Sequence, residues 1–84
     1  MKYISISKLA KLLNITNEIN KKPLNYVLRY WEKEFKQIKP ILLNKRRYYS
    51  KNQVEIIKLI NFLLKNKGMT IKGVKNVLNK NINK

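Results

Sequence analysis

Cysteine and histidine are both absent from this 84-residue chain. Their absence excludes disulfide bonds and the metal sites that cysteine and histidine build. It also removes the most common general base and the thiol nucleophile of many enzymes. We therefore expect a protein that is not an enzyme and that holds neither a metal nor a cofactor.

Long hydrophobic runs are missing as well. No apolar stretch of the chain approaches the ~20 residues that a membrane-spanning helix requires. The opening residues, MKYISI, have neither the apolar core nor the small-residue cleavage site of a secretory signal. These features predict a cytoplasmic protein with no membrane partner.

Acidic residues are scarce: the chain has 4 of them against 20 lysines and arginines, which gives a formal net charge of +16. Such an imbalance favours an anionic partner, nucleic acid first and an anionic membrane surface second. The hydrophobic fraction of 44% is ordinary for a single small globular domain and too high for a disordered tail. Codon bias of an AT-rich genome could also supply several of the lysines as solvated surface.

Arginine is rare in this basic chain, because only Arg29, Arg46 and Arg47 accompany 17 lysines. Lysine replaces arginine at little cost where any positive charge suffices. The exchange is costly where a planar, forked donor must grip a phosphate or a guanine edge. The three arginines are therefore candidates for nucleic-acid contacts from two separate parts of the chain.

Hydrophobic spacing predicts two helices in the first half of the chain. The first covers residues 7–13, with Ser7 as its N-cap and Asn14 in a left-handed conformation at its end. Residues 16–22 are polar and form either a loop or a ragged extension of a neighbouring helix. Pro23 suits the first turn of the second helix.

Two further helices are predicted in the second half. One spans about residues 51–66, begins with an S-x-x-Q capping box at residues 50–53, and stops at Gly68. Thr70 caps the last helix, and the polar residues 79–84 are expected to fray.

The second helix is predicted to be amphipathic, with opposite faces of different chemistry. Its apolar face carries Leu24, Val27, Leu28, Trp31 and Phe35. Its other face carries Asn25, Tyr26, Arg29 and Lys33, with Tyr30 on the flank. An ordinary surface helix is the alternative, but exposed tyrosines beside an arginine are typical of a binding surface. We therefore expect Tyr26, Arg29, Tyr30 and Lys33 to contact DNA.

Residues 38–50 resemble a small β-hairpin, because two short apolar or aromatic runs flank Asn44 and Lys45. Asn44 suits a left-handed turn position. The tip and the return strand carry the second set of candidate DNA contacts: Lys45, Arg46, Arg47 and Tyr48. A solvated basic loop is the alternative to this hairpin.

Several of these segments together resemble the DNA-binding domain of the MerR family of regulators. The sequence VLRYWE at residues 27–32 is similar to the recognition-helix signature of the family. RRYYS at residues 46–50 looks like the return strand of its wing, and GMTIKGV at residues 68–74 looks like the start of its fourth helix. The ISKLAKLLNIT segment at residues 6–16 looks like its opening helix and turn. This version of the pattern is most similar to regulators of alphaproteobacteria.

The resemblance implies a mainly α winged helix-turn-helix of about four helices with a two-stranded β-hairpin wing. It implies base or phosphate contacts for Arg29 and Tyr30, a phosphate contact for Arg47 and an anchoring role for Tyr49. Arg46 falls where many members have an aromatic residue. The connection at residues 17–24 is longer than the tight turn of the family.

The resemblance also implies an organisation and a set of partners. Residues 1–79 would form the DNA-binding domain, and residues 80–84 would lead to a dimerisation helix that is absent here, so the longer protein would be a homodimer. We expect a cytoplasmic, nucleoid-associated protein that binds double-stranded DNA with sequence specificity and regulates transcription. An architectural or excisionase-like protein that bends DNA is the main alternative, and an amphipathic membrane-surface protein is a further one.

Overall fold

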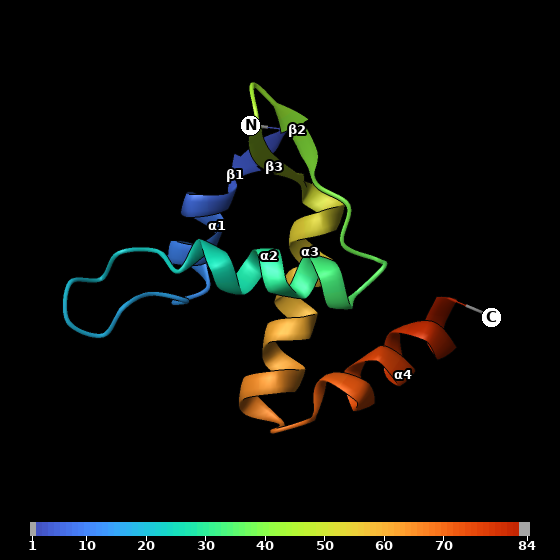
Figure 1. Ribbon diagram of the computed structural model, residues 1–84. Coiled ribbons are helices and arrows are strands. Elements are labelled where there is room, and N and C mark those ends of the chain that lie inside the picture. The colour runs from blue at the N-terminus through green and yellow to red at the C-terminus, as the bar shows by residue number, and fades with distance from the viewer. Residues whose placement is uncertain (1, 83–84) are drawn as a thin grey trace.

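The computed structural model describes residues 2–82 and has the mainly helical architecture that the sequence predicts (Figure 1). Four α-helices accompany a small sheet in this part of the chain. The elements in chain order are β1 (Tyr3–Ser5), α1 (Ile6–Leu12), α2 (Asn25–Glu34), β2 (Ile41–Leu43), β3 (Arg46–Ser50), α3 (Lys51–Asn61), the π-helical turn η1 (Phe62–Asn66) and α4 (Ile71–Ile82). The last helix includes residues 80–82 of the predicted polar tail, and residues 83–84 lie outside the described residues.

The predicted hairpin is confirmed, and it belongs to a sheet with one strand more than expected. The strands are antiparallel in the order β1-β3-β2. Asn44 and Lys45 form the turn, with φ angles of 51° and 65°. Both central residues of a two-residue type I′ turn need positive φ, and asparagine tolerates this better than lysine. The extra strand arises because Ile4 pairs with Tyr49 and covers the free edge of β3.

Two predictions about helix starts are wrong. Ser5, not Ser7, caps α1: its Oγ accepts a hydrogen bond from the Lys8 N–H at 3.2 Å. Pro23 does not lie in the first turn of α2, because it forms an isolated β-bridge with Thr16. The chain is held extended there, and α2 begins two residues later at Asn25.

The connection between α1 and α2 is an ordered loop rather than an extension of either helix. Asn14 ends α1 with φ 58°, as expected. The side chain of Asn17 accepts hydrogen bonds from the backbone of Ile19 and Asn20, at 2.9 and 3.2 Å, which is a local turn that asparagine favours. The backbone N–H of Asn17 also donates to the Lys22 carbonyl at 2.9 Å, closing the loop at its base.

The start of α3 confirms half of the predicted capping box. Ser50 Oγ accepts from the Gln53 N–H at 3.3 Å. The Gln53 side chain does not return to the cap. It accepts from the Lys39 N–H at 2.7 Å and donates to the Gln37 carbonyl at 3.0 Å, which fastens the segment leading into the wing to α3.

The last turn of the third helix differs from the α-helical turn that the sequence predicts. The helix reaches Asn66 as predicted, but the turn is π-helical: the Lys67 N–H donates to the Phe62 carbonyl five residues earlier at 3.1 Å. Gly68 then stops it with φ +65°, and Thr70 caps α4 through a 3.0 Å hydrogen bond from the Gly73 N–H, both as expected.

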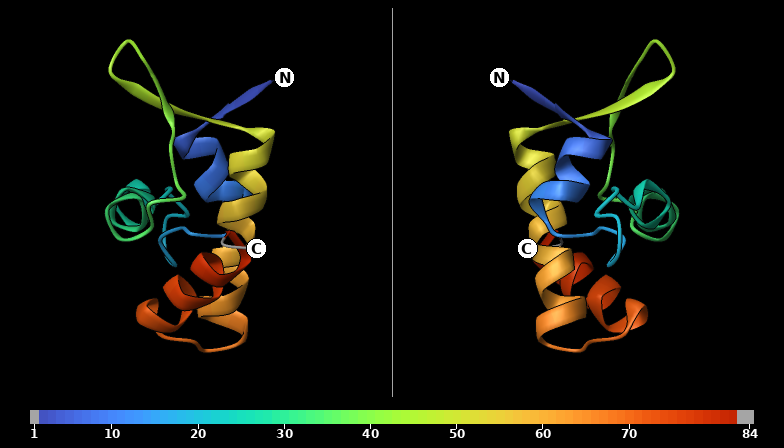
Figure 2. Two further views of the ribbon diagram at one scale, coloured as in Figure 1. Left: turned by 90° about the vertical axis from the view of Figure 1, so that its right-hand side faces the viewer. Right: turned by 90° about the vertical axis from the view of Figure 1, so that its left-hand side faces the viewer.

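A single apolar core joins α1, α2, β3, α3 and α4. Its members are Leu9, Ala10, Ile15, Leu28, Trp31, Phe35, Ile38, Tyr49, Ile57, Ile60, Val74 and Leu78. The apolar face predicted for α2 is confirmed by the burial of Leu28, Trp31 and Phe35. The tip of the wing projects on the same side of the molecule as α2, whereas the start of β1 and the start of α3 lie on the opposite side (Figure 2).

Candidate nucleic-acid interface

The outward face of α2 presents the four residues predicted for it. Tyr26 and Tyr30 have 62% and 50% of their surfaces exposed, and Arg29 and Lys33 are exposed as well. Large aromatic side chains normally leave water in a monomer, so two exposed tyrosines beside a cation form a surface suited to binding. The buried Leu28 and Trp31 fix the helix from behind, and a 2.9 Å hydrogen bond from Asn25 Nδ2 to Ser7 Oγ joins its first turn to α1.

Strand β3 distributes its side chains over the two faces of the sheet. Because side chains alternate along a strand, Arg46 and Tyr48 lie on one face, and Arg47 and Tyr49 lie on the other. Arg46 is exposed, Arg47 and Tyr48 are half-buried, and Tyr49 is fully buried. Lys45 is exposed at the tip of the hairpin. The adjacent arginines therefore differ in surroundings, which the sequence did not indicate.

All three arginines line one hollow between α2 and the wing. It has a volume of about 450 Å³, and the start of α1 completes its wall. The lining residues are Ser5, Ile6, Ser7, Asn25, Arg29, Lys45, Arg46, Arg47 and Tyr48. An adjacent hollow on the surface of α2 shares Arg29 and Arg47 and adds Tyr26, Tyr30, Glu32 and Lys33. The eight residues predicted from the sequence thus line two neighbouring hollows.

Two ion pairs hold α2 against its neighbours. Arg47 Nε donates to Glu32 Oε1 at 2.7 Å and so joins the wing to α2. Lys75 Nζ lies 3.0 Å from Glu34 Oε1 and joins α4 to the end of α2. Two of the four acidic residues of the chain are therefore used to fix this helix.

Tyr49 lies in the core close to these charges. Burial, together with the nearby Glu32 carboxylate, raises the pKa of its hydroxyl to about 12, and the Arg47 and Arg29 guanidinium groups oppose this shift. Within the described part of the chain, the Tyr49 hydroxyl has no hydrogen-bond partner. The ring therefore supports the wing from beneath while its hydroxyl stays neutral.

Comparison with models of known protein families identifies the family of this chain. A model described as MerR HTH family regulatory protein matches residues 4–81. The chain belongs to the MerR family. No curated protein and no solved structure shows significant similarity to it. Proteins of the MerR family are DNA-binding regulators of transcription and are not enzymes.

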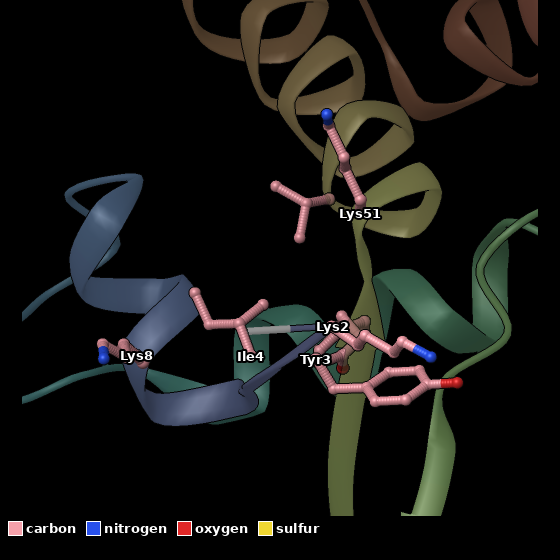
Figure 3. Close-up of a pocket in the computed structure, with 7 residues that line it drawn as sticks. Lys2, Tyr3, Ile4, Lys8 and Lys51 are labelled. Carbon is pink, nitrogen blue, oxygen red and sulfur yellow. The ribbon is translucent and has the colours of Figure 1, made fainter.

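This MerR domain has a further hollow, at the start of β1 and α3 (Figure 3). Its volume is about 290 Å³, and it is lined by Lys2, Tyr3, Ile4, Lys8, Tyr49, Lys51 and Val54. The nitrogens of Lys2, Lys8 and Lys51 lie apart around it. It contains no arginine, and its floor is apolar.

Sequence reasoning missed Glu32 and Ser7 as parts of the candidate interface of this MerR domain, and it placed Asn25 on the outer face of the second helix without assigning it a DNA contact. The signal for Glu32 was available, because two of the four acidic residues of the chain, Glu32 and Glu34, lie in this one helix. Within residues 2–82, no three acidic, histidine or cysteine side chains gather as metal ligands. None of the helices described there has the length and hydrophobicity needed to cross a bilayer.

Proposed function

We propose that this chain binds double-stranded DNA at specific sequences and regulates transcription, with α2 in the major groove and the wing on the flanking backbone. The observation that supports it most is the hollow where Arg29 from α2 meets Arg46 and Arg47 from the wing. In a chain with 17 lysines, Arg29, Arg46 and Arg47 all line this one hollow. A guanidinium binds a phosphate or a guanine edge through two parallel hydrogen bonds, whereas an ammonium acts as a point charge.

The shape of the surface fits a duplex. The major groove is about 12 Å wide and admits one α-helix. The apolar face of helix α2 packs on the core, whereas Tyr26, Arg29, Tyr30 and Lys33 on its outer face are exposed and can enter that groove. The wing projects on the same side (Figure 2), where it would follow the backbone beside the groove. We assign base or phosphate contacts to Tyr26, Arg29, Tyr30 and Lys33.

The wing would supply the contacts that do not depend on sequence. Lys45 and Arg46 are exposed at and beside its tip, and Tyr48 borders the hollow. Such groups position a protein on phosphates and make its affinity depend on salt. Arg47 would contribute a phosphate contact from the base of the wing.

The proposal is tested by selecting bound duplexes from a random library and then measuring affinity by fluorescence anisotropy at several salt concentrations. We expect an enriched motif and a linear fall of log affinity with log salt. If two copies bind together, as the family resemblance implies, the motif will have two-fold symmetry. Binding without any enriched motif would favour a DNA-bending architectural protein. Failure to bind any duplex at about 100 mM salt, where even non-specific binders associate measurably, would overturn the proposal.

A further inference from the structure

We propose that Glu32 is a positioning residue for DNA binding, which orients the Arg47 guanidinium so that its remaining N–H groups can bind a phosphate. This inference rests on the proposed function. It assigns an acidic residue inside the interface a favourable role toward an anionic partner, although its charge alone would repel that partner.

The geometry of the pair supports this role. Glu32 Oε1 engages only Nε of Arg47, at 2.7 Å. A guanidinium carries five N–H donors. Among residues 2–82, the terminal nitrogens of Arg47 make no hydrogen bond. The Nε of the Arg47 guanidinium is thus fixed by Glu32, and the N–H donors on the terminal nitrogens stay available to a phosphate.

Partial burial strengthens the hydrogen bond between Arg47 and Glu32. The side chains of Arg47 and Glu32 keep only 30% and 29% of their surfaces exposed. Partial desolvation strengthens a charge-assisted hydrogen bond, so the Arg47 side chain is restrained before any ligand arrives. Restraint in the unbound protein lowers the entropy lost on binding.

The position of the pair connects the two halves of the interface. Glu32 lies one turn after Arg29 on α2, and its partner lies on β3 of the wing. Arg29 and Arg47 line both hollows, so two cations of like charge share one small region. The Glu32 carboxylate offsets their repulsion and lets both face the same stretch of backbone.

A competing role for Glu32 gives the opposite result. If the carboxylate merely occupies Arg47 in the free protein, its removal would release Arg47 and add one positive charge, and DNA would bind more tightly. If Glu32 positions Arg47, its removal weakens binding despite the added charge. The sign of the change therefore separates the two roles.

The test compares the wild-type chain with Glu32→Ala, Arg47→Ala and the double variant, by fluorescence anisotropy with the selected duplex. We expect Glu32→Ala to weaken binding by about tenfold. It should also make the fall of log affinity with log salt less steep, by the amount that corresponds to about one phosphate contact, and Arg47→Ala should do the same. In the Arg47→Ala background, Glu32→Ala should cause no further loss, and affinity should stay equal or rise because a carboxylate that repels DNA is removed.

Two further variants serve as controls. Glu55→Ala adds the same charge on an exposed site of α3, where Glu55 lies 3.5 Å from Lys58, and should leave affinity equal or slightly higher. Glu32→Gln keeps an acceptor oxygen at the same place and should retain more binding than Glu32→Ala. Circular dichroism melts establish that each variant is folded at the assay temperature.

Equal or tighter binding by Glu32→Ala would overturn the positioning role and leave the proposed function intact. An equal loss in the presence and absence of Arg47 would overturn it too, because Glu32 would then act through α2 alone. Failure of the wild-type chain to bind any duplex would overturn the proposed function and, with it, this inference.

Discussion

Two basic hollows on this molecule differ in the kind of cation that lines them. The hollow between α2 and the wing contains Arg29, Arg46 and Arg47 with one lysine, Lys45. The hollow at the start of β1 and α3 contains three lysines and no arginine (Figure 3). Both are positive, so net charge alone would not distinguish them. The difference lies in donor geometry, because only the guanidinium offers paired hydrogen bonds in a fixed plane.

The residues that surround the cations also differ between the two hollows, which are here called the arginine hollow and the lysine hollow. Hydroxyl and amide groups of Ser5, Ser7 and Asn25 border the arginine hollow. Ile4 and Val54, with the ring of Tyr49, border the lysine hollow. Apart from Ile6, the residues beside the arginines have polar side chains, whereas apolar and aromatic residues accompany the lysines. In a chain rich in lysine, the positions of the arginines thus indicate a phosphate-binding surface better than the positions of positive charge in general.

The largest expected effect concerns Arg29. We expect Arg29→Ala to weaken specific DNA binding by about 1–3 kcal/mol, or roughly 5- to 150-fold. Lys8→Ala removes the same charge from the lysine hollow and should change affinity less than twofold, because an exposed charge outside the two hollows of α2 acts only through a screened field. Anisotropy titrations at one salt concentration measure both. Equal losses for the two variants would remove the distinction between the hollows.

Arg29→Lys sharpens the same comparison. It keeps the charge and removes the fork, so an affinity close to that of the wild type would show that charge alone acts at this position. A loss near that of Arg29→Ala would show that Arg29 acts through its geometry.

A second effect concerns Tyr49, whose ring borders the lysine hollow while the charges of Glu32, Arg47 and Arg29 act on its hydroxyl. Its pKa is raised to about 12 in the folded chain, against an ordinary value of 10.0. A raised pKa means that the unfolded chain loses this proton first as pH rises. The contribution of this group to the free energy of unfolding, up to roughly 2–3 kcal/mol, is therefore fully present below pH 10 and is lost between about pH 10 and 12.

Tyr49→Phe isolates this contribution from the lysines, which titrate in the same range. The variant lacks the buried hydroxyl that has no partner, so we expect its unfolding free energy at pH 7 to equal or exceed that of the wild type by about 1 kcal/mol. Urea unfolding at pH 9, 10 and 11 should show a steeper fall for the wild type. A destabilised variant at pH 7 would mean that the hydroxyl makes a favourable interaction after all.

Local features of this fold could be predicted from the sequence, and non-local pairings could not. The amphipathic face of α2, the Ser50 cap and the left-handed Asn44 depend on residues within a few positions of one another. The link between Glu32 and Arg47 joins residues 15 positions apart and depends on how the wing folds back on α2.

The wrong predictions have the same origin. Ser5 and Ser7 are equally good caps by composition, and only the pairing of β1 with β3 places the start of α1 after Ser5. Pro23 suits a first helical turn as well as a β-bridge, and its bridge to Thr16 decided between them. The Gln53 side chain met the backbone of residues 37 and 39, which the capping-box pattern does not include.

The smallest effect concerns Lys45, the lysine of the arginine hollow. Lys45 has φ 65° in the turn of the wing, a conformation that costs a residue with a side chain about 1 kcal/mol. Lys45→Gly removes that strain, and Asn-Gly is the preferred pair for such a turn, so the unfolding free energy should rise by about 0.5 kcal/mol. The same change removes one charge at the tip and should weaken DNA binding a few-fold.

Lys45→Ala separates the two consequences, because alanine removes the charge but keeps the strained conformation. If Lys45 contacts a phosphate, both variants should lower the salt slope by about 0.9, while only the glycine variant gains stability. Unchanged affinity in both would mean that the wing binds DNA through Arg46, Arg47 and Tyr48 without Lys45. The arginine hollow would then contain no lysine that contributes to binding, and its contrast with the lysine hollow would be complete.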